Sequence, residues 1–214
     1  MSFTTEIFST DDGYNGYCGM VYHSGTVWST VRGATTGTVA TNSWNGSAGD
    51  HLDGAFGANL NGSIYALSRY FLGFGLLGMI SPSASISAAY IKVYGYPYYG
   101  YSYPTVYQGS QAFTLTTADY ANFYAGSFGN LGSWFSSNWN TIPFNSTGIA
   151  YLQTLVGTTT RPLFCIRDTS HDVGGITPTL FSTISSVVCF PGIHRALLGV
   201  TYDLPPLTQQ VIFI

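Results

Sequence analysis

The sequence predicts an all-β protein, an antiparallel two-sheet β-sandwich of the jelly-roll type in which helix is confined to short turns. Short runs in which apolar and polar residues alternate recur along the 214 residues, and Gly, Asn, Ser and Pro separate them. Alternation with a period of two is typical of strands that bury one face. No spacing fits β-α-β units, which favours a sandwich over an α/β fold.

Strand runs can be assigned along most of the chain. The clearest reads ISAAYIKVYGY, and it places Ile91 and Val93 on the face predicted to be buried. Tyr90, Lys92 and Tyr94 alternate with them and are predicted to face water. The predicted strands are residues 4–10, 25–32, 63–74, 86–96, 111–116, 162–168, 179–190 and 196–203.

Helix is expected in two places only. The run NSTGIAYLQTL has the composition of a short helix, with Asn145 or Ser146 as its N-cap. The run TTADYANFY is the second, with Thr116 or Thr117 as its N-cap. Neither run is long enough to change the predicted all-β class.

We expect a single domain over residues 1–204, because neither a fixed-period repeat nor a linker composition interrupts the chain. Pro205 and Pro206 end the last predicted strand, since proline cannot donate to a strand ladder. Residues 205–214 are therefore interpreted as a C-terminal extension. We expect its apolar end to be buried, either on its own sheet or as a strand added to a neighbouring subunit. The residues of this assembly strand are Val211, Ile212, Phe213 and Ile214.

Charged residues are scarce. They make up 7% of the chain, against about a quarter in typical soluble proteins, and the net charge is −3. The six basic residues are scattered singly, which argues against nucleic-acid binding. The apolar run YFLGFGLLGMI is too short to span a membrane, and no signal-peptide pattern is visible. A surface that barely repels its own copies suits an assembly, so we expect a virion or extracellular location.

The segment SRYFLGFGLLGMISPSASISAAYIKVYGY, residues 68–96, resembles the core signature of the DNRLRE family of carbohydrate-binding-module-like jelly rolls. That signature is an arginine, alternating apolar residues, a short turn and a second alternating strand. The resemblance runs loosely over residues 3–203, and it implies a jelly roll like those of secreted polysaccharide-binding proteins and phage structural proteins. Gly75 departs from the pattern, because an aspartate is usual there. The matching positions are Arg69, Leu72, Phe74, Ile86, Ala89, Ile91 and Val93.

Arg69 stands at the head of the most apolar strand of a chain that has few charges. An arginine in this position can lay its stem over apolar neighbours and hold a carboxylate or several loop carbonyls. Asp168 or Asp172, in the run IRDTSHD, is the expected partner. We therefore assign Arg69, Asp168 and Asp172 a structural role, with a ligand-contacting arginine as the alternative.

A tract rich in tyrosine, residues 94–107, is the best candidate for a binding site. It holds seven tyrosines in fourteen residues, in the run YGYPYYGYSYPTVY. Their rings could stack on sugars, anchor a protein partner, or pack a loop over the end of the sandwich, and composition alone does not separate these three. The candidate glycan-binding or partner-binding residues are Tyr94, Tyr96, Tyr98, Tyr99, Tyr101 and Tyr103.

A structural calcium ion is the one cofactor that the sequence leaves open. Jelly rolls of the resembled kind often carry such an ion, and calcium takes oxygen ligands. Glu6 near the start and Asp203 near the end are the candidate ligands, if their strands are adjacent. Asp50 and Asp53 are a second pair. The histidines lack the spacing of a zinc site.

Catalysis is not expected. Glycosidic hydrolysis needs two positioned carboxylates, and neither a nucleophile elbow nor a P-loop is present. Cys165 lies in an apolar run, which is a poor setting for a reactive thiolate. The alternatives for Cys165 and Cys189 are two buried thiols or one disulfide between their strands. We therefore predict that the protein is not an enzyme.

The favoured function is that of a structural protein of a virus particle, either a capsid decoration or a fibre subunit. Its expected partners are copies of itself or other virion proteins, and surface polysaccharide is a further candidate. One alternative is a secreted glycan-binding module, which would bind through the tyrosines as a monomer. Another is a subunit of an extracellular cellular filament.

Overall fold

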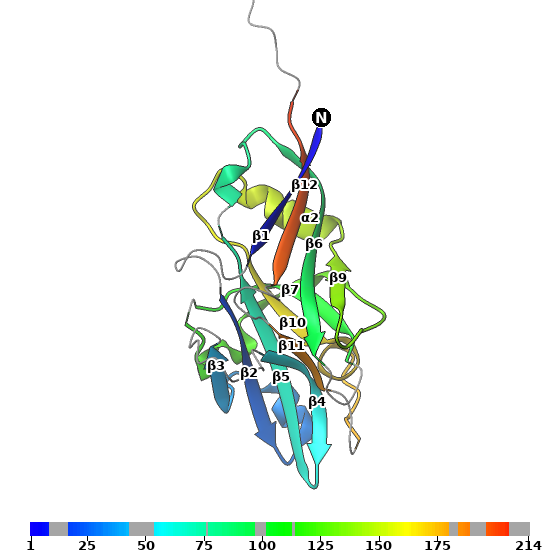
Figure 1. The fold of residues 1–214 in the computed structure, drawn as a ribbon. Helices are drawn as coiled ribbons and strands as arrows, with labels where there is room; N and C mark the ends of the chain where they lie inside the picture. The colour runs from blue at the N-terminus through cyan, green and yellow to red at the C-terminus, as the bar shows by residue number, and fades with distance from the viewer. Residues whose placement is uncertain are drawn as a thin grey trace, which may run out of the picture.

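The computed structural model confirms the all-β class, since strands make up 49% of it and form two antiparallel sheets. Every strand pairing is antiparallel, from β1 with β12 to β7 with β8. The predicted two-sheet sandwich is therefore the observed architecture (Figure 1). The structure describes residues 1–8, 17–42, 54–75, 77–96, 102–112, 114–179, 184–188 and 196–205.

The smaller sheet has four strands. In spatial order they are β1 (Ser2–Phe8), β12 (Leu197–Asp203), β6 (Ser85–Tyr96) and β9 (Trp139–Pro143). The first and last strands of the described residues are thus neighbours, and the long strand β6 lies between β12 and β9 (Figure 1).

The larger sheet has seven strands. Its central strand is β5, which pairs with β2 on one side and with β4 and then β10 on the other. The strands are β3 (Val39–Asn42), β2 (Tyr17–Gly25), β5 (Ile64–Gly73), β4 (Gly54–Asn61), β10 (Leu163–Asp168), β7 (Pro104–Gly109) and β8 (Phe123–Asn130).

A short strand, β11 (Ile184–Val188), joins the two sheets. It pairs with β4 of the larger sheet and with the end of β6 in the smaller one. Hydrogen bonding is therefore continuous through 12 strands, although they fold into two layers.

The main core lies between the two layers. Strand alternation directs Ile91 and Val93 of β6 inward, as the sequence predicts, and both are fully buried. Phe164 of β10 meets them from the other sheet, in the same buried cluster. Helix α2 (Ser146–Leu155) packs against β6 and β8 and adds Leu152 to this core.

A second core lies on the outer face of the larger sheet. The odd-numbered positions of β5 point there, so that Leu67 and Phe71 pack with Trp28 and Tyr120. The elements that cover this face are α1 (Trp28–Gly33) and the one-turn helices η3 (Thr117–Ala121) and η4 (Thr169–Val173). The remaining helical turn in the described part of the chain is η2 (Leu77–Met79).

Both expected helices are present. Asn145 caps α2, because its side-chain oxygen accepts hydrogen bonds from the backbone N–H groups of Thr147 and Gly148. Thr116 caps η3 in a capping box with Asp119, whose carboxylate accepts from the Thr116 backbone N–H.

Two predicted strands are wrong. Gly25 ends β2, and residues 28–32 belong to α1, with Trp28 and Val31 buried on one side three positions apart. Packing against the larger sheet overrides the β propensity of this valine- and threonine-rich run. Residues 111–116 form no strand where they are described. There the Asp119 side chain accepts hydrogen bonds from the Ala112 and Thr116 backbones and holds the segment as a loop.

Candidate functional site

The outer face of the smaller sheet carries a group of aromatic side chains, which we call the aromatic face: Tyr90, Lys92, Tyr94 and Trp139. The first three alternate along β6 and point away from the core, and each is half-buried. Trp139 begins β9 directly opposite Tyr94, and it is half-buried as well. No described helix lies in front of β1, β12 and β6 in Figure 1.

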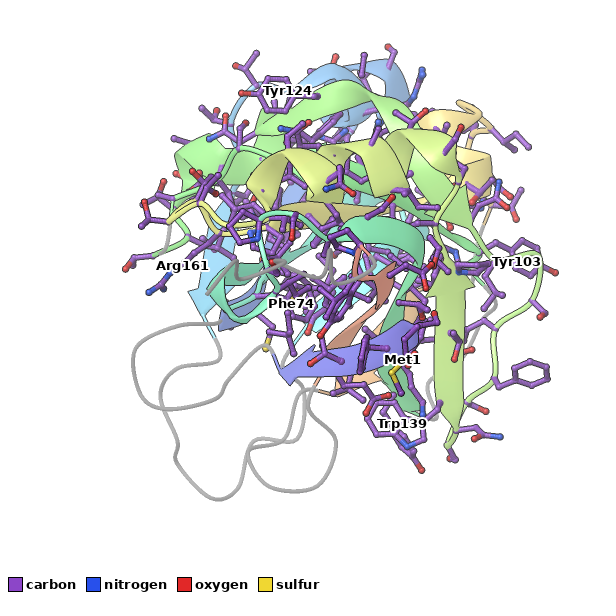
Figure 2. All side chains as sticks on the ribbon, turned by 90° about the horizontal axis from the view of Figure 1, so that it is seen from above. Met1, Phe74, Tyr103, Tyr124, Trp139 and Arg161 are labelled. Atoms are coloured by element: carbon purple, nitrogen blue, oxygen red, sulfur yellow. The ribbon has the colours of Figure 1, made fainter. Side chains whose placement is uncertain are left out.

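Tyr94, Lys92 and Trp139 hold one another in place. The Tyr94 and Trp139 ring centroids are 5.5 Å apart, and the planes are nearly perpendicular at 83°. The Lys92 Nζ lies 5.1 Å from the centre of the Trp139 ring, within the range of a cation–π interaction. Figure 2 shows Trp139 projecting from the sandwich on the side of β1. These contacts orient the indole before any partner arrives.

Tyr90 lies across the sheet because Gly199 leaves room for its ring. A Cβ atom at Gly199 would stand 2.2 Å from the ring, so only glycine permits this position. The Tyr90 hydroxyl donates a hydrogen bond of 2.8 Å to Glu6 Oε1, on the edge strand β1. Burial, and then the bond to Glu6, raise the pKa of the Tyr90 hydroxyl. Tyr90 thus bridges three strands.

The chemistry of the aromatic face suits binding better than catalysis. Its rings offer flat apolar surface, and Lys92 offers an ammonium group that donates hydrogen bonds and attracts anions. Thr141, opposite Lys92 on β9, adds an exposed hydroxyl. In the described chain, no acid–base pair or nucleophile with an activating base lies in this group.

The structure brings together only part of the predicted tyrosine site. Tyr94 belongs to the aromatic face. Tyr103 is 38% exposed, but it precedes β7 of the other sheet, where its carbonyl accepts from Thr169. The Tyr96 side chain and all of Tyr98, Tyr99 and Tyr101 lie outside the described part of the chain.

A buried ion-pair network occupies the outer face of the larger sheet. Of the two expected partners, Asp172 binds Arg69. The guanidinium makes two bonds of 2.8 Å to the carboxylate, and both side chains are almost fully buried. The remaining Arg69 donors reach the carbonyls of Tyr120 and Arg32, so the arginine ties β5 to η3, η4 and α1.

Arg167 completes the network. It also grips Asp172 with two bonds, of 2.8 and 2.7 Å, so two arginines share one carboxylate. The Phe123 ring lies near both guanidinium groups, 4.2 Å from that of Arg167 and 5.0 Å from that of Arg69. Tyr120 also stacks on Arg69 at 4.0 Å. The aromatic rings therefore cover the one positive charge that the carboxylate does not balance.

The electrostatics of Asp172 identify the network as structural. Burial alone would raise the pKa of its carboxyl group, but hydrogen bonds from Arg167 and Arg69, together with their charges, hold the pKa below its ordinary value. Arg32 adds a bond of 2.8 Å to the Asp172 carbonyl. A charge enclosed by this many donors has little capacity left for a ligand.

Asp168 has a separate local role. Its carboxylate accepts a hydrogen bond from the backbone N–H of His171, which caps the one-turn helix η4. Its other oxygen is buried without a hydrogen-bond partner in the described chain. By holding η4, Asp168 positions Asp172 for the two arginines.

The structure does not bring the predicted calcium ligands together. β1 and β12 are adjacent, but Glu6 pairs with Gly199 and Asp203 pairs with Ser2. Four positions along β1 separate the two carboxylates, about 14 Å at roughly 3.4 Å per residue. No cluster of three or more His, Cys, Asp or Glu exists in the described residues, and Asp50 and Asp53 lie outside them.

Cys165 is a buried free thiol on β10. Burial raises its pKa to about 12, so it carries no reactive thiolate at neutral pH. Cys189 lies outside the described residues, as do Val211, Ile212, Phe213 and Ile214 of the predicted assembly strand. Among the helices that are described, none has the length and apolar content to cross a membrane.

No family model matches the chain, and no curated protein is significantly similar to it. The likeness to the DNRLRE signature therefore stays a prediction. Four residues central to these sites were not predicted as site residues. Tyr90 and Lys92 were predicted only to face water, and their alternation along β6 was the available signal. Arg167 lies next to the predicted Asp168, and a second arginine near a paired carboxylate indicates a network. Trp139 stands alone in the polar run SSNWNT, where the sequence carries no signal for it.

Proposed function

We propose that the chain is a non-enzymatic structural protein of a virus particle, a capsid decoration or fibre subunit, located in the virion or outside the cell. The observation that carries the proposal is where its few charges lie. Arg69 and Arg167, two of the six basic residues, form ion pairs with Asp172 inside the fold. The surface is left with few charges to oppose contact between copies.

The arrangement of the smaller sheet supports the same proposal. In the described chain β1 pairs on one side only, with β12, so its outer edge offers unpaired backbone groups. Such an edge can accept a strand from another subunit by β-augmentation. The apolar residues 211–214 are the expected donor, and the partner is another copy or another virion protein.

Deletion of residues 207–214 tests the proposal. The full chain should sediment as an oligomer or polymer, and the deleted chain should remain folded but sediment as a monomer. Analytical ultracentrifugation, with circular dichroism as the control for folding, measures both. A full chain that stays monomeric at high concentration contradicts the assembly role.

The second candidate is a secreted glycan-binding module, and the aromatic face favours it. Tyr94 and Trp139 form an oriented pair of rings on an outer sheet face, which is a suitable surface for stacking on sugars. A glycan-binding module would bind polysaccharide as a monomer. Affinity electrophoresis in polysaccharide gels, run beside the sedimentation experiment, separates the two functions. A subunit of a cellular filament would assemble like the virion protein, but its gene would lie beside secretion genes.

A further inference from the structure

We propose that the aromatic face binds an acidic polysaccharide, a polymer of sugars that bear carboxylates. A sugar ring stacks on Trp139 beside Tyr94, and its carboxylate accepts hydrogen bonds from Lys92. This inference rests on the glycan-binding candidate and gives its ligand a chemical class. It does not depend on the assembly role.

Lys92 supplies the charge complementarity. It is the only lysine of a chain whose net charge is −3. No carboxylate of the described residues forms an ion pair with it, in contrast to Arg69 and Arg167. Its ammonium group instead lies over the Trp139 ring. A half-buried cation without a protein carboxylate favours an anionic ligand at this position.

Glu6, a carboxylate of the described chain on the same face, is held apart from Lys92. It lies on β1, two strands from β6 and level with Tyr90, so its Cα atom is about 12 Å from that of Lys92 at a strand spacing of roughly 4.8 Å and a rise of roughly 3.4 Å per residue. It also accepts the hydrogen bond of Tyr90. The face therefore has a positive position beside the rings and a negative one at its edge. An anionic sugar placed on Trp139 meets Lys92 and avoids Glu6.

The hydroxyl groups on this face suit a sugar chain. Thr141 is exposed opposite Lys92, and the Thr4 and Thr201 hydroxyls meet at 3.1 Å farther along the same face. Groups that both donate and accept can adapt to sugar hydroxyls. A second copy of the chain would also cover the rings, and the experiment below separates that occupant from a polysaccharide.

The experiment measures binding of the full chain to alginate, polygalacturonate and hyaluronan, and to the carboxyl-esterified form of each. Esterification keeps the sugar rings and removes the charge. We expect binding to at least one acidic polymer, weakened at least tenfold by esterification and weakened by added salt. Isothermal titration calorimetry at low and high ionic strength gives both comparisons.

Matched variants locate the site. Lys92→Gln should lower affinity about tenfold, and Lys92→Arg should restore most of it, because arginine keeps the charge. Trp139→Ala should lower affinity at least as much through lost stacking. Tyr124→Ala is the control, since Tyr124 is 54% exposed on the other sheet and lies on the opposite side of the view in Figure 2. Thermal melting of each variant confirms that it is folded.

Three outcomes overturn the inference, and they differ in meaning. Equal binding to the acidic and esterified polymers would support a glycan-binding module, but it would contradict the inference that the ligand is an acidic polysaccharide. Binding to none of the polymers would contradict the glycan-binding function as well. If Trp139→Ala instead abolishes self-association, the aromatic face is a contact between copies and not a polysaccharide site.

Discussion

The two outer faces of the sandwich use charge and aromatic rings in opposite ways. On the larger sheet, Asp172 and its two arginines are enclosed beneath short helices, and Phe123 and Tyr120 cover the guanidinium groups. On the smaller sheet, Lys92 and Trp139 are half-buried and in contact with solvent. A cation–π contact in a closed layer stabilises the fold, whereas the same contact on an open face can be shared with a ligand.

The contrast also explains why a chain with so few charged residues buries two arginines in its interior. α1, η3 and η4 are too short to be stable alone, since isolated helices of this length are marginal in water. Arg69 binds a carbonyl or carboxylate from each of them. The network therefore acts together with the second core to fix a layer that helix propensity alone would not hold.

The largest expected effect on stability is at the closed face, which is the outer face of the larger sheet with its buried ion-pair network. Asp172→Ala leaves two arginines without their carboxylate and should lower the free energy of unfolding by about 3–5 kcal/mol. Urea denaturation monitored by fluorescence measures it. Asp203→Ala, at the partly exposed end of β12, is the matched control and should cost little. A loss below about 1 kcal/mol for Asp172→Ala would show that the helices are held by packing alone.

Acid should weaken the same face. The pKa of Asp172 is lower in the folded chain than its ordinary value of 3.8, so the stability that it contributes is complete above that value. This stability is lost as the pH falls through the lowered pKa. Urea denaturation between neutral pH and pH 2 should show the loss, and Asp172→Asn should remove this part of the pH dependence. An unchanged pH dependence in the variant would contradict the assignment.

How much of this contrast the sequence could predict depends on the range of the interactions. The alternation in β6 is local, so both of its faces were predictable. The pairing of Arg69 was predictable only as a choice between Asp168 and Asp172. The choice depends on η4, a one-turn π-helix that ends β10 and turns Asp172 back over the sheet. Long-range packing decides that geometry, and the chain carries no local signal for it.

The open face, which is the aromatic face of the smaller sheet, was less predictable. Strand β9 spans only Trp139–Pro143, too short for a convincing period, and it forms by pairing with a distant β6. In β2, β4, β7 and β8, Gly, Asn and Tyr interrupt the alternation that would predict a strand, and β3 has only four residues. The run that forms α1 has the composition of a strand, and its helical conformation depends on burial against the larger sheet.

A smaller effect on stability is expected at Gly199, because the position of the Tyr90 ring on the open face requires a glycine there. Gly199→Ala places a Cβ against the Tyr90 ring and should displace it from Glu6. The hydrogen bond contributes about 1 kcal/mol, and its loss should offset the gain that alanine usually brings to a strand. The pKa of Tyr90 should then fall toward 10.0, measurable by NMR titration of ring-labelled tyrosine.

Gly132→Ala is the control for this substitution, because no heavy atom lies within 4 Å of its added Cβ. It should leave the Tyr90 titration unchanged. If Gly199→Ala also leaves that titration unchanged, Tyr90 is not held across the sheet, and the edge strand β1 is not tied to the aromatic face through Glu6.

The smallest effect tests whether the open face is ordered before it binds. Tyr94 and Trp139 meet edge to face, and such pairs couple by about 0.5–1.5 kcal/mol beyond the area that they bury. A double-mutant cycle with Tyr94→Ala and Trp139→Ala in urea denaturation measures this coupling. The pair Tyr94→Ala and Tyr124→Ala, on different sheets, should be additive within about 0.5 kcal/mol. Coupling no larger than in that control would mean that Trp139 is not oriented by Tyr94. The outer face of the larger sheet would then hold a fixed network, and the aromatic face would be a loose surface. A ligand on the aromatic face would have to order the rings, which would lower its affinity.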